Sequence, residues 1–496
     1  MFILLPLLLP LLIYLIYRLT TPITPPNFPP GPANYPLAGG AYIFSRLNSN
    51  FTRALIELGH KYGPITGIHL GQMRSIVVTG YDAVKEVLSR DEFQGRPEIF
   101  LNKLTYGEGR KLGLIFGEGE SWKNQRRFTL RHLRGFGFGK SSMETVIHEE
   151  ISELIMRLKS GPNPVRLDNA FGPPVINVLW VILSGKRSPH DDPDFLRLLH
   201  LLYEVFRSGN ADGGALQDWP FLRFFPPWSK QFKKMKDGRD ALMGMLAGEV
   251  RAHSTALNDN EDDQPRDFID LYLKEINAIK LAGNLDSDFT EEQLLVILHD
   301  LFAAGAESTT NTIAFSLLYM IIYPEVQCKV QAELDKVVGK ARLPVYEDRI
   351  HLPYCEAVLC ELMRISSIAP ITVPHSTLQD VEIRGWTVPK DTFCLISLAS
   401  VHMDKDYWRD PEVFRPERFL GDDGKVIKTE RLMGFGHGKR VCLGELLARM
   451  SSFDFFTVIL QNFRLELDSG REKPDLTPVE GFTVAPKEFW ARVTGR

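Results

Sequence analysis

The most informative stretch of the chain is Phe435-Gly-His-Gly438-Lys-Arg440-Val-Cys442-Leu-Gly444. It places one cysteine among glycines, beside an arginine, directly before an apolar helix-like stretch. The glycines allow the backbone to approach something flat and bulky. A nearby arginine and a helix N-terminus stabilise a thiolate, the form of cysteine that binds a metal. A buried structural cysteine in a turn is the ordinary alternative, but five fixed positions within ten residues favour a thiolate ligand.

The pattern F-x-x-G-x-R-x-C-x-G resembles the haem-binding loop of the cytochromes P-450, the haem-thiolate monooxygenases. The resemblance implies that Cys442 is the axial ligand of the iron of haem b. It also implies that Phe435 and Gly438 contribute to the cofactor site. A thiolate is the ligand type that favours O–O bond cleavage by haem.

The N-terminus has a different composition from the rest of the chain. Residues 2–17 are almost wholly apolar and Arg18 follows them, although the run is shorter than the ~20 residues of a standard membrane span. It lacks the basic start and small-residue cleavage site of a signal peptide. Residues 22–36 are rich in proline and are not expected to form helix. We therefore expect a membrane anchor over 1–21, a proline-rich hinge over 22–36 and a catalytic domain over 37–496; an uncleaved peripheral segment is the alternative to the anchor.

The composition is that of a globular protein. Of its 496 residues, 44% are apolar and 24% are charged, which suits one large core. The net charge of −4 gives no reason to expect a nucleic-acid partner. The five cysteines form no C-x-x-C pair, which fits thiols kept reduced on the cytosolic side of a membrane.

Hydrophobic periodicity predicts many helices and few strands. Short strands are expected over 65–70 and 75–79, and helices over 81–88, 143–158 and 353–366. Thr290-Glu-Glu-Gln293 is a capping-box pattern that predicts a long helix up to Tyr323. Residues 258–267 form an acidic stretch that is expected to be a solvated loop. The fold class is mainly α with minor β, as a single catalytic domain around one haem.

The middle of the long predicted helix carries Ala303-Ala-Gly-Ala-Glu307-Ser308-Thr-Thr310. Small residues allow a planar group to lie against the backbone, and a hydroxyl can bond a carbonyl one turn back. Cleavage of dioxygen consumes two protons, so we interpret Glu307 and Ser308 as a catalytic acid–alcohol pair. The family pattern A-G-x-D/E-T has threonine where Ser308 stands, which leaves the coupling efficiency open. A close helix–helix contact is the alternative interpretation.

Two further motifs extend the resemblance to the haem and its support. Glu361-Leu-Met-Arg364 and Pro416-Glu-Arg418-Phe resemble the segments that lock the region supporting the cysteine loop, so these charges are expected to be structural. Trp122-Lys-Asn-Gln-Arg126 resembles the stretch that contacts a haem propionate, because an indole N–H and a guanidinium both donate to carboxylates. By the same resemblance Arg96, His375 and Arg440 are propionate partners; His375 could instead be a satisfied core histidine.

Two surfaces have candidate partners. Arg127, Arg131, His132 and Arg134 continue a basic face that suits an acidic electron donor, although a solvated face is the default. The resemblance implies that NADPH supplies electrons through cytochrome P-450 reductase, with cytochrome b5 as a further partner. Residues 220–228 pack aromatic residues among prolines; core packing and a second membrane contact are both open.

The finer resemblance is to animal clan-two microsomal enzymes, which implies the endoplasmic reticulum membrane with a cytosolic catalytic domain. Residues 131–144 resemble arthropod members, including those that epoxidise methyl farnesoate or farnesoic acid. The resemblance also implies pocket walls that are nearly all apolar, and hence a lipid-like substrate, although core packing explains any single wall residue equally well. These walls are Leu114, Phe116, Phe206, Ala303, Ala304, Ile371, Val373 and Phe482. A steroid, fatty-acid or xenobiotic hydroxylase, a reductase-independent isomerase or dehydratase, and a haem carrier or sensor are the alternatives.

Removal of residues 1–21 tests the anchor. The truncated protein should leave the membrane fraction on cell lysis and keep its haem, because the prolines separate the anchor from the core. The full-length protein, washed at high salt, is the control. Loss of haem on truncation would mean that the segment packs into the domain.

Overall fold

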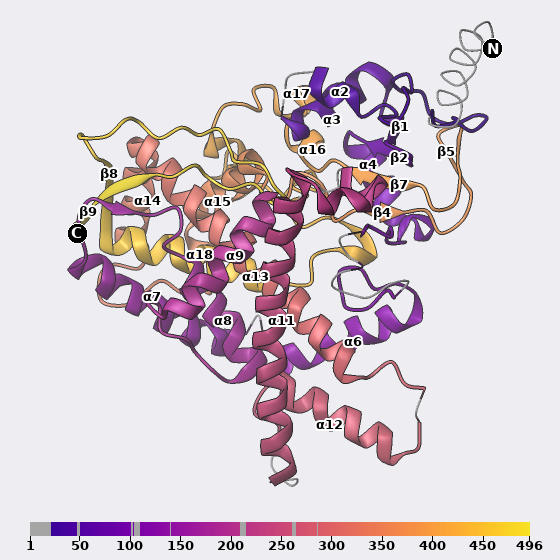
Figure 1. The fold of residues 1–496 in the computed structure, drawn as a ribbon. Coiled ribbons are helices and arrows are strands. Elements are labelled where there is room, and N and C mark those ends of the chain that lie inside the picture. Colours follow the sequence, from indigo (N-terminus) through magenta and orange to yellow (C-terminus); the bar gives the residue numbers. More distant parts are fainter. Residues whose placement is uncertain are drawn as a thin grey trace, which may run out of the picture.

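The computed structural model describes residues 21–46, 50–100, 103, 110–138, 140–208, 215–259, 264–284 and 286–496. The described chain is mainly helical with short strands, so the predicted fold class is confirmed (Figure 1). Strands β1, β2, β7 and β4 lie with α2, α3, α4 and α16 at one end, and β8 and β9 lie near the C-terminus at the other (Figure 1). The expected anchor over 1–21 lies outside the described residues except for Thr21.

The α-helices have the following bounds: α2 (Tyr42–Arg46), α3 (Phe51–Tyr62), α4 (Tyr81–Ser89), α6 (Gly119–Gly135), α7 (Ser141–Ser160), α8 (Gly172–Ser184), α9 (Pro193–Ser208), α10 (Ala215–Asp218), α11 (Trp228–Asp259), α12 (Phe268–Leu281), α13 (Glu291–Ile322), α14 (Pro324–Val337), α15 (Pro353–Ser366), α16 (Ala399–His402), α17 (Lys405–Trp408) and α18 (Glu445–Asn462). The 3-10 helices are η1 (Asp91–Phe93), η2 (Pro220–Phe224), η3 (Tyr346–His351), η4 (Pro416–Phe419) and η5 (Gly438–Arg440). The strands are β1 (Ile65–Leu70), β2 (Met73–Val78), β3 (Val165–Arg166), β4 (His375–Ser376), β5 (Val381–Ile383), β6 (Trp386–Val388), β7 (Phe393–Ile396), β8 (Phe463–Leu467) and β9 (Trp490–Gly495).

The four-stranded sheet has the order β1-β2-β7-β4. β1 and β2 are antiparallel with Ile65 opposite Val78, whereas β2 and β7 are parallel with Ser75 opposite Phe393. β4 pairs antiparallel with β7, so that His375 lies opposite Cys394. Two smaller sheets have the orders β3-β9-β8 and β5-β6. The large sheet therefore fixes the backbone of His375, one of the predicted haem contacts.

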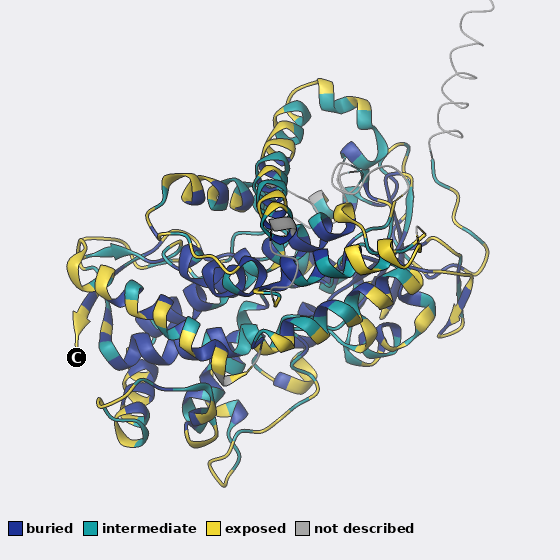
Figure 2. Ribbon diagram, turned by 90° about the horizontal axis from the view of Figure 1, so that it is seen from below, coloured by how far each residue is buried: buried dark blue, intermediate teal, exposed yellow. Residues whose placement is uncertain are grey.

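The long helix α13 forms the centre of the core. The Thr290 side chain caps it by accepting a hydrogen bond from the Gln293 N–H at 3.1 Å, and Pro324 follows its last turn. Buried residues occur all around the helix, which is typical of a helix that crosses a domain interior. Figure 2 shows the buried residues gathered in the central helices and the exposed ones along the outer helices. The predicted start and end of this helix are confirmed within one residue.

The other predicted elements agree with the structure at their centres. The strand predicted over 65–70 and the helix predicted over 353–366 have those bounds, while β2 begins two residues before the predicted strand. The core-packing interpretation of residues 220–228 is wrong for three aromatic side chains, because Phe221, Phe224 and Phe225 are 57%, 69% and 55% exposed.

The proline-rich segment docks onto the sheet. Within 22–36 there is no helix, and Phe28 is buried. The Gly67 N–H of β1 donates to the Pro30 carbonyl at 2.9 Å, and a Cβ on Gly31 would stand 1.6 Å from the Gly67 oxygen. The second half of this segment is thus held against β1.

Among the described residues, no single helix has the length and apolar character needed to span a membrane. One bent pair, Glu291–Ile322 with Pro324–Val337 at 109°, meets those criteria by length and composition alone.

The carboxylate of Glu361 on α15 is shared by two arginines. Arg364 donates to it from Nε at 2.7 Å and from Nη2 at 2.8 Å, and Arg418 of η4 donates from Nε at 3.0 Å. The side chains of Glu361 and Arg364 have no exposed surface. Arg364 also donates to the carbonyls of His402 and Pro411. The predicted structural role of the two motifs is confirmed, since one buried carboxylate joins α15 to the segment before the cysteine loop.

Glu361→Ala should destabilise the fold strongly. It leaves Arg364 without a carboxylate partner and Arg418 with Asp410 alone, and a broken buried pair costs about 3–5 kcal/mol. Thermal unfolding and haem content would measure the loss. Glu417→Ala is the matched control in the neighbouring motif, because its pair with Lys329 is 46% and 56% exposed and should contribute no more than about 1 kcal/mol. Equal effects of the two variants would contradict the structural role of Glu361.

Candidate haem-thiolate site

The cysteine loop is closed by its own backbone. The Cys442 N–H donates to the Phe435 carbonyl at 2.9 Å, and α18 begins three residues later. Gly438 has φ +71°, and a Cβ there would stand 2.1 Å from the Leu88 carbonyl oxygen. The close approach that requires Gly438 is therefore to the end of α4. The loop turns tightly because glycine accepts this conformation and leaves room for α4.

The Cys442 thiol lines an internal space. Its side chain is accessible, yet burial raises its pKa, a combination expected of a group that faces a cavity within the protein. The backbone N–H groups of Gly444 and Glu445 at the start of α18 and the Arg126 charge oppose that rise. Arg126 Nη2 also donates to the Val441 carbonyl at 2.5 Å. Donors and a cation therefore surround the sulfur, and a bound metal ion would stabilise its thiolate further.

Three arginines gather beside this space. Burial and the charges of Arg440 and Arg126 lower the pKa of Arg96, and burial and the Arg126 charge lower the pKa of Arg440 to about 10. Glu118 lies close enough to offset part of this charge, but it also pairs with Lys111 at 2.7 Å. Arg440 Nε and Nη1 are buried and have no hydrogen-bond partner among the described residues. Unpaired donors in a positive interior fit an anionic group such as the two carboxylates of haem.

His375 and Trp122 lie with these arginines. Burial and the Arg96 charge lower the pKa of His375, and its Nδ1 bonds the Phe93 carbonyl at 2.7 Å. Nε2 is then the ring nitrogen that remains to face a ligand. The guanidinium carbon of Arg440 lies over the Trp122 ring, 3.6 Å from the ring centroid. The Trp122 indole N–H donates to the Leu114 carbonyl at 3.1 Å. Trp122 thus orients Arg440, and its own donor is engaged within the protein.

Arg96 is also anchored by backbone carbonyls. Its Nε donates to Ile115 at 2.8 Å, and its Nη1 donates to Val373 at 3.0 Å and to Pro374 at 2.8 Å. These bonds hold one side of the guanidinium against the strand that carries His375. The five predicted propionate contacts, Trp122, Arg126, Arg96, His375 and Arg440, therefore lie together near Cys442.

On α13 two small residues face different neighbours. Ala304 is exposed although the residues around it are buried or half-buried. A Cβ on Gly305 would stand 2.7 Å from Leu179 of α8, so Gly305 permits a close helix–helix contact. The interpretation as a close helix–helix contact is confirmed at Gly305, whereas the catalytic interpretation stays a prediction. The Ser308 hydroxyl donates to the Ala304 carbonyl at 2.8 Å, one turn back.

Glu307 is paired with Arg207 of α9. Arg207 Nη2 bonds its carboxylate, and both side chains are almost fully buried. Arg207 also donates to the Val479 carbonyl at 2.9 Å and to the Thr483 hydroxyl at 3.1 Å. Burial raises the pKa of Glu307 to about 7 although Arg207 acts in the opposite direction. The structure records no hydrogen bond between Glu307 and Ser308 among the described residues, so the predicted acid and alcohol are neighbours with separate partners.

Sequence reasoning did not single out Arg207. It lies in an amphipathic helix, 100 positions before Glu307, and no local pattern marks it. The adjacent Phe206 was expected to line the substrate site together with Phe482. Their rings meet edge to face with centroids 6.0 Å apart, and the Phe482 N–H donates to the Phe206 carbonyl. The expected neighbourhood of α9 and residues 479–484 is therefore present, and Arg207 adds a charge to it.

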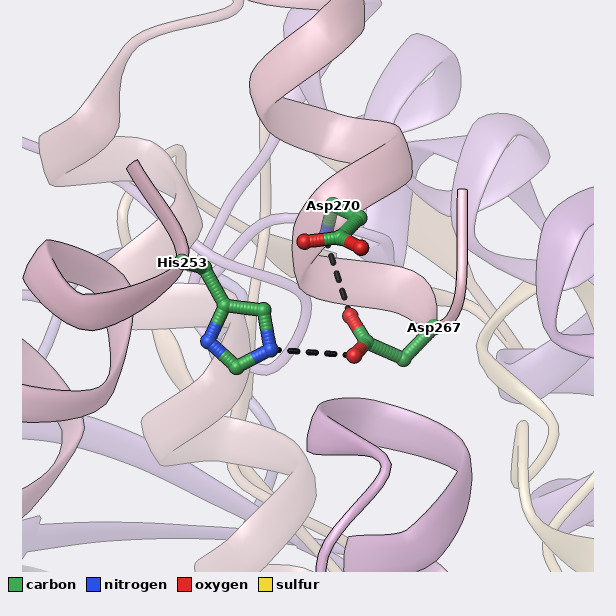
Figure 3. Close-up of side chains that lie close together, drawn as sticks. All are labelled: His253, Asp267 and Asp270. Atoms are coloured by element: carbon green, nitrogen blue, oxygen red, sulfur yellow. Dashed lines mark hydrogen bonds and ion pairs between the residues drawn. The ribbon is translucent and has the colours of Figure 1, made fainter. Parts of the chain in front are cut away.

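A second group of potential metal ligands, His253, Asp267 and Asp270, is shown in Figure 3. His253 Nε2 bonds one Asp267 oxygen at 2.9 Å, and the other Asp267 oxygen accepts the Asp270 N–H at 2.9 Å. Arg266 bonds both oxygens of Asp270. These atoms already satisfy one another, so the group is explained as a joint between α11 and α12. Asp267, the last residue of the expected solvated loop over 258–267, is instead buried as the cap of α12, and α11 extends to Asp259; residues 260–263 lie outside the described residues.

A mainly helical domain with an accessible thiol at the start of a helix, beside buried arginines with unpaired donors, has the features of a haem-thiolate enzyme. The chain belongs to the cytochrome P450 family, because the family model described as Cytochrome P450 matches residues 29–492. It is thus a haem-thiolate monooxygenase, and the family implies haem iron as its cofactor.

Similarity to curated proteins extends over most of the chain. Farnesoate epoxidase of Bombyx mori is 36% identical over 86% of this chain and 85% of its own. Cytochrome P450 2B2 of Rattus norvegicus is 36% identical over 92% of each chain. Cytochrome P450 2D3 of the same species is 33% identical over 92% of this chain and 91% of its own.

The raised pKa of Glu307 predicts a pH-dependent effect on stability. Its pKa is about 7 in the fold and about 4.5 when unfolded, so its stabilising contribution is complete below about pH 4.5 and is lost as pH rises towards 7. The slope is at most about 1.4 kcal/mol per pH unit. Glu307→Gln removes this titration, so the variant's melting temperature should rise relative to wild type as pH increases. Parallel curves would contradict the raised pKa; Glu417→Gln, at an exposed pair, is the control.

Proposed function

We propose that this monooxygenase is anchored in the endoplasmic reticulum membrane, faces the cytosol and receives electrons from NADPH through a reductase. The proposal rests on family membership together with the Cys442 thiol, which lies at the start of α18 beside buried arginines. Cytochrome b5 is a further candidate donor. The test is to measure turnover in the membrane fraction with and without NADPH and reductase. Turnover that requires both would support the proposal, whereas turnover without NADPH would indicate an isomerase or dehydratase.

The haem would be held by residues already brought together. Cys442 supplies the metal ligand, and Arg440, Arg96 and His375 offer donors to the propionates. Arg126 and Trp122 orient the Val441 carbonyl and Arg440, respectively. Phe435 and Gly438 shape the loop. When bound, haem supplies the activation of dioxygen, with one oxygen atom entering the substrate and the other leaving as water.

The substrate is proposed to be an apolar lipid-like molecule that is hydroxylated or epoxidised. Candidate walls are Leu114, Phe116, Phe206, Ala303, Ala304, Ile371, Val373 and Phe482, all apolar. A relative named farnesoate epoxidase favours a sesquiterpenoid such as methyl farnesoate or farnesoic acid. Spectral titration of the ferric protein with sesquiterpenoids, steroids and fatty acids tests the class. Tighter binding of steroids or fatty acids would overturn the sesquiterpenoid assignment.

Protons are proposed to pass through Ser308 near the reacting oxygen. Its hydroxyl is held by the Ala304 carbonyl, on the face of α13 where Ala304 is accessible. Glu307 has a pKa of about 7, so both protonation states are populated near neutral pH. Its carboxylate bonds Arg207 and has no recorded hydrogen bond to Ser308 among the described residues, so we assign Glu307 as a proton reservoir that reaches Ser308 through water or by a change of rotamer.

Two exposed surfaces support the proposed partners. Arg127, Arg131 and Arg134 of α6 are exposed on the helix that also carries Trp122, and suit an acidic electron donor. The exposed Phe221, Phe224 and Phe225 suit contact with the membrane.

Replacement of Cys442 tests the ligation. The reduced carbon monoxide complex of wild type should show the strongly red-shifted Soret band of thiolate ligation, and Cys442→Ala should abolish it. Cys328→Ala is the control, because Cys328 is a free exposed thiol elsewhere and the band should survive. A red-shifted band in Cys442→Ala would refute the assignment.

Replacement of Ser308 tests the proton path. Ser308→Ala should bind substrate and consume NADPH, but product per NADPH should fall and hydrogen peroxide should rise. Ser308→Thr keeps the hydroxyl and should couple at least as well as wild type. Thr312→Ala is a control one turn further, where the hydroxyl bonds the Ser308 carbonyl. Unchanged coupling in Ser308→Ala would remove Ser308 from the mechanism.

A further inference from the structure

His402, the last residue of α16, joins α15 to the segment that leads into the cysteine loop. It is fully buried. Its Nδ1 lies 2.7 Å from the Ser367 hydroxyl, and its Nε2 lies 3.0 Å from the Met433 backbone nitrogen. Its own carbonyl accepts a hydrogen bond from Arg364 at 2.9 Å. One residue therefore contacts the end of α15, the buried arginine and the backbone two residues before Phe435.

The partners determine the tautomer of the ring. A backbone N–H can only donate, so Nε2 must accept from Met433, and the ring proton must lie on Nδ1 and be donated to Ser367. Burial and the Arg364 charge lower the pKa of His402 to about 3, so the ring stays neutral near pH 7 and Nε2 keeps its lone pair.

Ser367 and Gly434 hold this contact in place. Ser367 ends α15 in the left-handed region with φ 44°, which is unusual for a residue other than glycine. A Cβ on Gly434 would stand 2.9 Å from Met363 Cγ of α15 and 4.0 Å from His402 Cε1. The backbone at 433–434 thus lies directly against α15 and the His402 ring.

Two backbone hydrogen bonds continue from this point to the thiol. The Met433 carbonyl accepts from the Gly436 N–H at 2.8 Å, and the Phe435 carbonyl accepts from the Cys442 N–H at 2.9 Å. The first of these hydrogen bonds starts at Met433, the residue that His402 binds, and the second starts two residues later at Phe435. A shift of Met433 would move the carbonyl that fixes the Cys442 backbone.

We propose that His402 is a positioning residue for the Cys442 thiolate, which acts by accepting a hydrogen bond from the Met433 backbone. The inference rests on the proposed ligation of haem by Cys442. The competing explanation is a core histidine that stabilises α16 and has no specific effect on the loop. The two explanations differ in whether the acceptor at the Nε2 position matters or only the volume of the side chain.

Two amide variants separate them. The amide oxygen of His402→Gln can reach the position of Nε2, whereas the shorter His402→Asn places its amide near Nδ1 and leaves the Met433 N–H without an acceptor. The holoenzyme of each variant is titrated with urea, and the red-shifted carbon monoxide band is recorded together with helical circular dichroism. In His402→Asn, the ratio of carbon monoxide complex with a blue-shifted band to complex with the red-shifted band should rise by roughly five- to 150-fold before the helical signal is lost. This is the effect expected of an unsatisfied buried amide. In Gln the ratio should stay close to wild type.

Ile276→Ala in α12 is the control for general destabilisation, because Ile276 is a buried core residue of a helix remote from α15. Its band should disappear only with the helical signal. Equal ratios in Asn and Gln, or loss of band and helix together in Asn, would overturn the role of His402. Failure of the ligation itself is distinguishable, since wild type would then lack the red-shifted band and Cys442→Ser would not change the spectrum.

Discussion

The buried carboxylate of Glu361 is the contact on which the region around the thiol depends. It pairs with Arg364 on its own helix and with Arg418 from a segment more than fifty residues later, and the three side chains are 0%, 0% and 6% exposed. Arg364 then uses its remaining donors on the carbonyls of His402 and Pro411. Irregular chain is difficult to bury because its backbone groups need partners. Here charged side chains provide those partners, and the cysteine loop rests on a rigid base.

Electrostatics at the site are unbalanced without a cofactor. Burial and the charges of Arg440 and Arg126 lower the pKa of Arg96, and burial and the Arg126 charge lower the pKa of Arg440. Arg440 also keeps two buried donors that have no partner in the described part of the chain. A buried cation normally has an anion beside it. The most economical explanation is that the anion belongs to a cofactor, and that the protein's charges are arranged to be completed by it.

Helix α13 packs closely at one residue and leaves the preceding residue accessible. Gly305 lets it approach α8, while Ala304 is exposed. Glu307 turns towards α9, where Arg207 ties it to residues 479–483. Helix α9 is thus joined to the central helix through one buried ion pair. Any movement of α9 would therefore alter the charge environment of Glu307.

The features that could be predicted from the sequence are local ones. Thr290 caps α13 by accepting a hydrogen bond from the N–H three residues later. Glu361 and Arg364 are three residues apart on one helix, and the glycines beside Cys442 define a tight turn. Short spacings fix geometry because helix and turn dihedrals leave few alternatives. Only tertiary structure placed Arg207 against Glu307 and His402 against Met433, and exposed the aromatic side chains of η2 and its C-terminal flank. Those outcomes depend on how distant segments pack, and no local spacing encodes the distance between them.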